Sequence, residues 1–127
     1  MKQKIVWPDL MRMTKSDVDC FPRFTVVDKG IYVINTLYFF TGTSANRVCL
    51  VLNSEYAAYY FLSNVAVLDK GGFRMFKQYV ENIPIPDISK IDCEEDVYIA
   101  FGFSDEEITF IKSVVARRKE EIVNGAE

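Results

Sequence analysis

The chain has 127 residues, half of them hydrophobic, which is enough to bury one hydrophobic core. Its apolar runs are far shorter than the roughly 20 residues of a membrane-spanning helix, and its first residues lack the apolar core of a signal peptide. There is no histidine, and the three cysteines, Cys20, Cys49 and Cys93, are widely spaced. We therefore expect a soluble, cytoplasmic protein with no membrane partner, disulfide framework or metal site.

Charge is distributed unevenly along the chain, although the formal net charge is only -3. Residues 1–79 carry ten Lys or Arg against six Asp or Glu, a net charge of +4. Residues 80–127 carry five against twelve, a net charge of -7. The first part is suited to face phosphates and the second to face solvent or another domain, although chance segregation of surface charge gives the same pattern.

Strands are expected in the first third of the chain. The segments Lys4–Trp7, Phe24–Val27 and Ile31–Phe40 are rich in β-branched and aromatic residues. Asp28-Lys29-Gly30 supplies a turn between the last two. Trp7-Pro8, at the end of the first strand, is expected to form a packing corner.

Two short helices should follow. Ser44 is a suitable N-cap for a helix whose apolar residues recur at helical spacing, namely Ala45, Val48, Cys49 and Leu52. After a structural break at Asn53-Ser54, a second helix is expected from Ser54 to about Leu62. Both serines are better explained as helix caps than as nucleophiles.

The middle of the chain alternates short elements and turns. Val65–Leu68 is a candidate strand and ends at Asp69–Gly72, where paired glycines permit backbone shapes closed to other residues. A helical turn is expected near Phe76–Glu81. Ile83–Pro86 should be extended, because proline disfavours helix in the residue before it.

The last predicted element is a helix of about twenty residues. Ser104–Glu107 forms a capping box, and Gly125 is a stop signal. Arg117–Lys119 lies near its C-terminal end, where positive charge is favourable. Apolar residues follow the capping box at helical spacing: Ile108, Ile111, Val115 and Ile122.

The absence of a regular strand-helix alternation predicts an α+β single domain over residues 1–127. We expect a mostly antiparallel sheet, two or three packed helices and a long C-terminal helix, with residues 97–127 a helical extension. The acidic segment Ser89–Asp96 is the nearest feature to a hinge.

Catalytic chemistry is not expected in this chain. Asn82-Ile83-Pro84-Ile85 is not the Asn-Pro-Pro-aromatic loop that adenine methylation requires, and Phe101-Gly102-Phe103 is not a cofactor-binding turn. No acidic residue is followed two positions later by lysine, and histidine-based catalysis is excluded. We therefore predict no catalytic residue and no cofactor.

The order of several segments carries a resemblance to a known family. The series begins with Ile5–Asp9 and continues through Asp28–Tyr32, Asn35–Tyr38, Leu50–Ser54, Gly71–Arg74 and Lys77–Pro86. Each motif is common, but in this order and spacing they resemble the TaqI-like C-terminal specificity domain. The resemblance covers about two thirds of the chain, from Lys4 to Pro86.

The resemblance implies that the chain is a target-recognition domain of an adenine-N6 DNA methyltransferase or a type II restriction-modification enzyme. In that family a separate N-terminal domain transfers the methyl group, and this methyltransferase domain is absent here. The implied partners are double-stranded DNA and the methyltransferase domain of the parent protein. No family role is implied for the residues after Pro86.

The densest group of candidate DNA contacts is Lys70, Arg74 and Lys77, around the flexible Gly71-Gly72. Arg74 and Lys77 are expected to project toward DNA, with solvated surface as the alternative. Phe73 and Tyr79 nearby fit core positions better than base contacts.

A second candidate is the loop and helix start that contain Thr43, Asn46 and Arg47. Hydroxyl groups, backbone N–H groups at a helix start and one arginine can bind phosphate together. Plain helix capping explains the same residues equally well.

A competing function is a protein-interaction module. In that hypothesis the apolar stripe of the C-terminal helix docks a partner, and the acidic tail assists. The stripe is needed by both hypotheses and does not separate them.

Overall fold

The structure is a computed structural model that describes residues 2–8, 10–15, 21–27, 35–40, 45–65, 67–68, 71–75 and 77–125. For residues 2–4, 35–40, 67–68 and 77 it describes the backbone. In chain order the elements are β1 (Lys2–Trp7), β2 (Leu10–Arg12), β3 (Thr25–Val27), β4 (Asn35–Phe40), α1 (Ala45–Leu52), α2 (Glu55–Asn64), β5 (Val67–Leu68), β6 (Gly72–Arg74), α3 (Lys77–Glu81), a 3-10 turn (Ile88–Lys90), α4 (Glu94–Phe101) and α5 (Asp105–Gly125).

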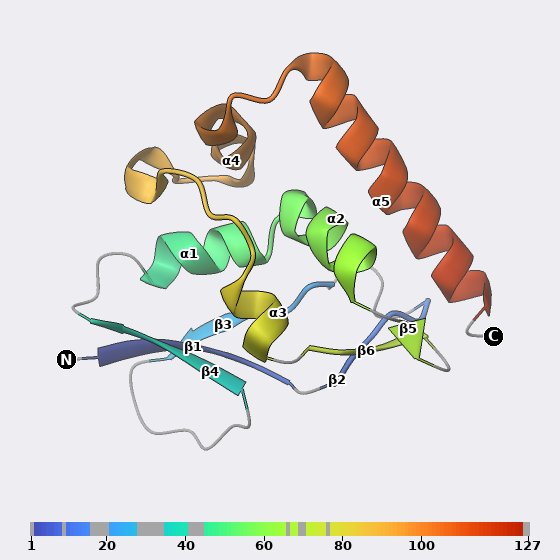
Figure 1. The fold of residues 1–127 in the computed structure, drawn as a ribbon, viewed down its shortest axis with the longest axis horizontal. Helices are drawn as coiled ribbons and strands as arrows, with labels where there is room; N and C mark the ends of the chain where they lie inside the picture. Colours follow the sequence, from blue (N-terminus) through green and yellow to red (C-terminus); the bar gives the residue numbers. More distant parts are fainter. Residues whose placement is uncertain are drawn as a thin grey trace.

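The strands form two small antiparallel sheets, in the orders β3-β1-β4 and β2-β6-β5. In Figure 1 they lie along one side of the molecule, with α1, α2, α4 and α5 on the other. The predicted α+β class is therefore confirmed. The predicted turn at Asp28–Gly30 and the N-cap Ser44 lie outside the described residues.

Trp7 and Pro8 form the corner where the chain leaves the first sheet for the second. The Trp7 side chain is 2% exposed, and its Nε1 donates a 2.7 Å hydrogen bond to the carbonyl oxygen of Met75. The centroid of its ring lies 5.4 Å from that of the Phe24 ring. The predicted packing corner is confirmed, and it joins β1 to the segment after β6.

The hydrophobic core lies between the strands and the helices. Ile5 of β1, Met11 of β2 and Phe73 of β6 are all 0% exposed and belong to one cluster with buried side chains of α1 and α2. All four apolar positions expected to face inward from α1 are buried: Ala45, Val48, Cys49 and Leu52. Because inward-facing side chains of the strands share this core with those of the helices, strands of only three residues are stable here.

Asn53 and Ser54 break the helix between α1 and α2, as predicted. The Ser54 side chain caps α2 by accepting a hydrogen bond from the backbone N–H of Ala57. The Asn53 side chain accepts from Phe24 N–H at 2.7 Å and donates to the Phe24 carbonyl at 2.9 Å. Both backbone groups of Phe24, which directly precedes β3, are therefore satisfied by one side chain of the helix break.

The segment Ser89–Asp96, the nearest feature to a hinge in the sequence, instead runs from a 3-10 turn into the first turn of α4, which begins at Glu94. The Asp96 carboxylate accepts hydrogen bonds from the backbone N–H groups of Asp92 and Cys93 and fixes the beginning of the helix. Glu94 accepts from the N–H of Glu55 at 2.7 Å, and Tyr98 donates to the Glu55 carboxylate at 2.9 Å. Glu94, an acidic residue of this segment, thus attaches α4 to the start of α2, where negative charge is favourable.

The long C-terminal helix is confirmed as α5. Ser104 and Glu107 make the reciprocal capping-box hydrogen bonds, at 2.9 and 3.1 Å. The predicted stripe packs inside the domain, because Ile111, Val115 and Ile122 are buried in the core cluster and Ile108 packs against it. The stripe is therefore not a free surface for a partner. Within the described residues no helix is both long and apolar enough to cross a membrane.

The Asn53 contacts make a test of the helix break. Asn53→Ala should lower the free energy of unfolding by about 1–3 kcal/mol, because it removes both hydrogen bonds to Phe24 and leaves the Phe24 N–H without its side-chain acceptor and the Phe24 carbonyl with only the weak Cys49 thiol donor. Asn64→Ala is the matched control: Asn64 is exposed and bonds only within its own helix, to Tyr60. Urea unfolding of both variants measures the difference, and equal stability of the two would contradict the role given to Asn53.

The α5 capping box makes a test of pH dependence. Hydrogen bonds from Ser104 lower the pKa of Glu107 below its usual 4.5. A lowered folded-state pKa means that the carboxylate stabilises the fold above the usual value, and that this stabilisation is lost as the pH falls through the folded pKa. Glu107→Gln should therefore be less stable than the unsubstituted chain at pH 7, and the unfolding curves of the two proteins should converge in acid. A difference that persists unchanged in acid well below pH 4.5 would refute this assignment.

Candidate nucleic-acid interface

Two arginines lie on the outer face of the second sheet. Leu10 of β2 pairs directly with Arg74 of β6, and Met11 pairs with Phe73. Met11 and Phe73 point into the core, where both are 0% exposed. Because alternate residues of a strand face opposite sides, Arg74 and Arg12 share the other face, and both are exposed.

The arrangement gives two cationic side chains fixed on neighbouring strands. Each guanidinium group carries several N–H donors in a rigid plane, which suits phosphate oxygens and the acceptor edge of guanine. The buried Met11 and Phe73 hold the backbone beneath them in place. This face can therefore present positive charge to a nucleic acid without a change in the core.

The sequence placed Lys70, Arg74 and Lys77 in one cluster. Lys70 lies outside the described residues, and Lys77 is the first residue of α3, with its side chain outside the description. Arg74 is exposed on β6. The structure thus supports the placement of Arg74 on the surface and leaves the lysine contacts as predictions.

The glycine pair before Arg74 behaves differently from the expected flexible turn. Gly71 has a φ of 70°, which favours glycine, but Gly72 is the first residue of β6 and pairs with Arg12 and Leu68. Arg74 is therefore held by strand pairing. Phe73 is core, as predicted, and Tyr79 is partly buried against the core.

The second candidate group consists of Thr43, Asn46 and Arg47. Thr43 lies outside the described residues, and Asn46 is exposed in the first turn of α1. The Arg47 guanidinium donates a 2.7 Å hydrogen bond to the Ser89 carbonyl and lies 3.6 Å from the Asp92 carboxylate. Arg47 therefore ties α1 to the segment that precedes α4.

Arg12 was missed by sequence reasoning. The signal was present in Leu10–Met13, where an arginine stands between two methionines that are both 0% exposed. Such alternation is typical of a half-buried strand. Three residues are too few for the pattern to stand out without the partner strand β6.

No group of three or more potential metal ligands occurs within the part of the chain that the structure describes. Cys49 is buried, and desolvation raises the pKa of its thiol, with a smaller opposing effect from a hydrogen bond with Asn53. Its Sγ lies 3.3 Å from the Phe24 carbonyl oxygen, so this cysteine supports the same backbone as Asn53.

Comparison with protein-family models gives one match: residues 1–85 match the TaqI-like C-terminal specificity domain. The chain belongs to this family. No curated protein and no solved structure matches it. The predicted resemblance is thereby confirmed, including its end near the Ile-Pro segment.

Membership in the TaqI-like specificity-domain family supports a role in DNA recognition in restriction-modification systems, in association with a methyltransferase. The matched residues run from β1 to just beyond α3 and include both Arg12 and Arg74. Helices α4 and α5 lie outside the match. The strand face described above thus belongs to the part of the chain that defines the family.

The contacts of Arg47 make a test of its role. Arg47→Ala should lower the free energy of unfolding by about 1 kcal/mol, since it removes a charged hydrogen bond and a partly exposed ion pair. Asp92→Asn removes the ion pair alone and should cost less. Chemical unfolding of both variants measures the effect, and an Arg47→Ala protein of unchanged stability would show that the contact with Ser89 contributes nothing.

Proposed function

We propose that this chain is the target-recognition domain that gives sequence specificity to an adenine-N6 DNA methyltransferase or a type II restriction-modification enzyme. The family match carries the proposal. The exposed pair Arg12 and Arg74 supplies the surface that such a role needs. A methyltransferase domain of the parent protein and double-stranded DNA are the partners, and the cytoplasm is the compartment.

The strand face is the proposed DNA-facing surface. Lys70 and Lys77 flank β6 in the sequence and remain the proposed further DNA contacts. Asn46 lies in the first turn of α1 and Thr43 precedes that helix in the sequence; both are proposed as phosphate contacts together with backbone N–H groups of the helix start. Contacts with phosphates position a domain, and the contacts with base edges give it sequence specificity.

Charge along the chain supports this orientation. The residues up to 79 have a net charge of +4, and those from 80 onward have a net charge of -7. A duplex that approached the acidic part would be repelled, whereas the strand face attracts it. Arg47 bonds to Ser89 and pairs with Asp92, so we propose for it a structural role first, in holding α1 to the segment before α4, and a DNA contact second.

The chain itself is proposed to be non-catalytic, with residues 1–127 forming one recognition domain and residues 97–127 its helical extension. Methyl transfer requires a cofactor turn and an amine-binding loop, and the sequence contains neither motif. The parent protein is proposed to supply that chemistry from its methyltransferase domain.

DNA affinity tests this function. Arg12→Ala, Arg74→Ala and Lys77→Ala should each weaken binding to duplex DNA by about 1–3 kcal/mol, with thermal stability nearly unchanged. Arg117→Ala is the matched control, because Arg117 is an exposed arginine on α5 that pairs with Glu121. Its loss should leave DNA affinity unchanged.

The measurement is fluorescence anisotropy with duplexes of several sequences over a range of salt concentrations. Binding by the chain should fall steeply with salt, because phosphate contacts release counterions. A loss confined to one sequence identifies a base contact, whereas a uniform loss with a shallower salt slope identifies a phosphate contact. If all three variants bind DNA as tightly as the unsubstituted chain, this face is ruled out. Methyl transfer by the purified chain would rule out the non-catalytic role.

A further inference from the structure

An aromatic groove lies between α2 and the first two turns of α5. Both helices lie on the side of the molecule away from the strands (Figure 1). The volume of the groove is about 390 Å³, within the size range of ligand pockets. Its lining consists of aromatic and aliphatic side chains with two carboxylates: Tyr56, Tyr59, Phe103, Glu106, Glu107, Phe110 and Ile111.

The floor of the groove is fixed by contacts inside the domain. Tyr56 is 9% exposed, and its hydroxyl group donates a 2.8 Å hydrogen bond to the Pro84 carbonyl. Gly102, with a φ of 73°, ends α4 in a left-handed turn. That turn brings Phe103 to 5.0 Å from Phe101 and 6.3 Å from Tyr56, between ring centroids. The groove therefore exists before any ligand binds.

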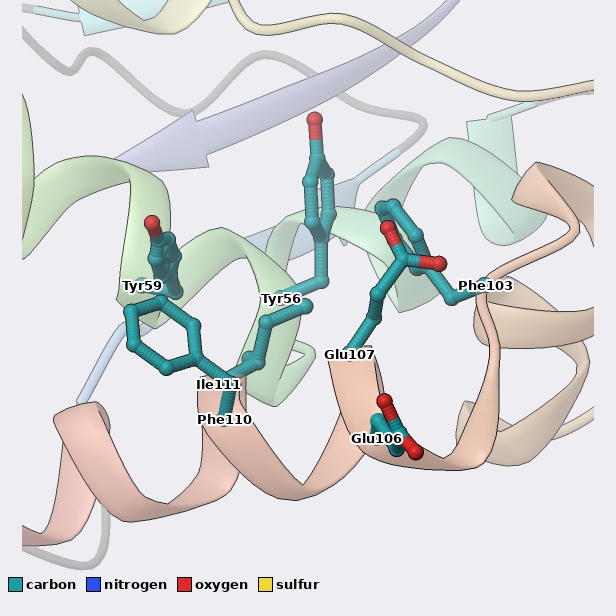
Figure 2. A pocket seen from close by; sticks show the side chains of 7 residues that line it. All are labelled: Tyr56, Tyr59, Phe103, Glu106, Glu107, Phe110 and Ile111. Carbon is teal, nitrogen blue, oxygen red and sulfur yellow. The ribbon is translucent and has the colours of Figure 1, made fainter.

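One wall of the groove is a large apolar side chain in solvent. Phe110 is 58% exposed, although it touches Tyr59 edge-on at 6.3 Å between ring centroids. Figure 2 shows Phe110 beside Tyr59 on this wall. An exposed aromatic residue beside an apolar groove is typical of an interaction site.

Two carboxylates give the groove a negative rim. Figure 2 shows the Glu107 carboxylate beside Phe103 and Glu106 on the first turn of α5. Glu106 is exposed, and hydrogen bonds from Ser104 keep the pKa of Glu107 below its usual value, so Glu107 is ionised at neutral pH. Both lie in the acidic part of the chain. This charge repels DNA and anionic lipid and attracts a cationic partner.

We propose that this groove binds a basic, amphipathic segment of a partner protein, which inserts an apolar side chain beside Phe110 and places Lys or Arg near Glu106 and Glu107. The apolar floor and the acidic rim together select such a segment. The floor alone would also admit neutral apolar ligands, and the rim alone would also admit purely ionic ones. Of the groove lining, only the residues of α2 lie within the part of the chain matched by the family model. This inference is therefore independent of the DNA-binding function.

The direct test uses two fluorescein-labelled helical peptides of about 18 residues. One combines a leucine stripe at helical spacing with lysine elsewhere, and the other has glutamate in place of every lysine. The first should bind the 127-residue chain and the second should not. Phe110→Ala and Glu106→Gln should each weaken binding of the first peptide by at least about fivefold, which is within the range for contacts at an interface.

Matched controls separate the groove from general attraction to the chain. Ile99→Ala removes an apolar side chain of α4 that is even more exposed than Phe110, and Glu95→Gln removes an exposed carboxylate outside the groove lining. Both should leave peptide binding unchanged. Because Phe110 and Glu106 are exposed, their variants should melt within a few degrees of the unsubstituted chain. DNA affinity should be the same in all variants.

The proposal is overturned if neither peptide binds, or if the control variants lose as much affinity as the groove variants. It is also overturned if sedimentation shows a dimer of the chain that Phe110→Ala dissociates, because a second copy is then the occupant. Loss of DNA affinity in Phe110→Ala would assign the groove to DNA recognition. Retained DNA binding with no peptide binding removes this inference and leaves the proposed function intact.

Discussion

The pairing of Asn53 with the backbone of Phe24 is the contact on which the arrangement of the domain depends. It joins the break between α1 and α2 to the start of β3, and Cys49 supports the same carbonyl from the preceding turn. With that joint fixed, α1 lies on the first sheet and α2 leaves it at an angle (Figure 1). Helix α2 then provides the surface on which α4 and α5 pack. One polar side chain thus links the part of the molecule that carries the arginines to the part that carries the groove.

Strongly patterned elements were predictable from the sequence, and contact-dependent elements were not. The capping box and spacing of α5, the Ser54 cap and the apolar side of α1 are local signals, and all three were found in the structure. Strands β2 and β6 are three residues each and exist because they pair with one another. Helix α4 was not predicted as a separate helix, although its residues from 97 onward lay in the expected helical extension, because its position depends on distant contacts such as that of Glu94 with the start of α2.

The same limit applies to the candidate site. Arg74 was recognised because it follows two glycines, but the pairing that places it beside the segment of Arg12 joins residues about sixty positions apart in the chain. Arg47 was one candidate phosphate contact, with helix capping as an equal alternative, and only the fold reveals its contacts with Ser89 and Asp92. Residue type and charge identify candidates, while the neighbours contributed by distant segments decide which of them faces solvent. The two faces that result are chemically distinct, one basic and built on strands, the other acidic, aromatic and built on helices.

Trp7 is the only tryptophan in the chain. It stands at the corner between the two sheets, where it is almost fully buried, lies against Phe24 and donates a hydrogen bond to Met75. Indole emission is sensitive to the polarity of its surroundings, so the fluorescence of this one residue reports on the corner alone. The protein therefore carries an intrinsic optical sensor for the joint between its sheets, which makes any rearrangement of that joint visible in solution without a label.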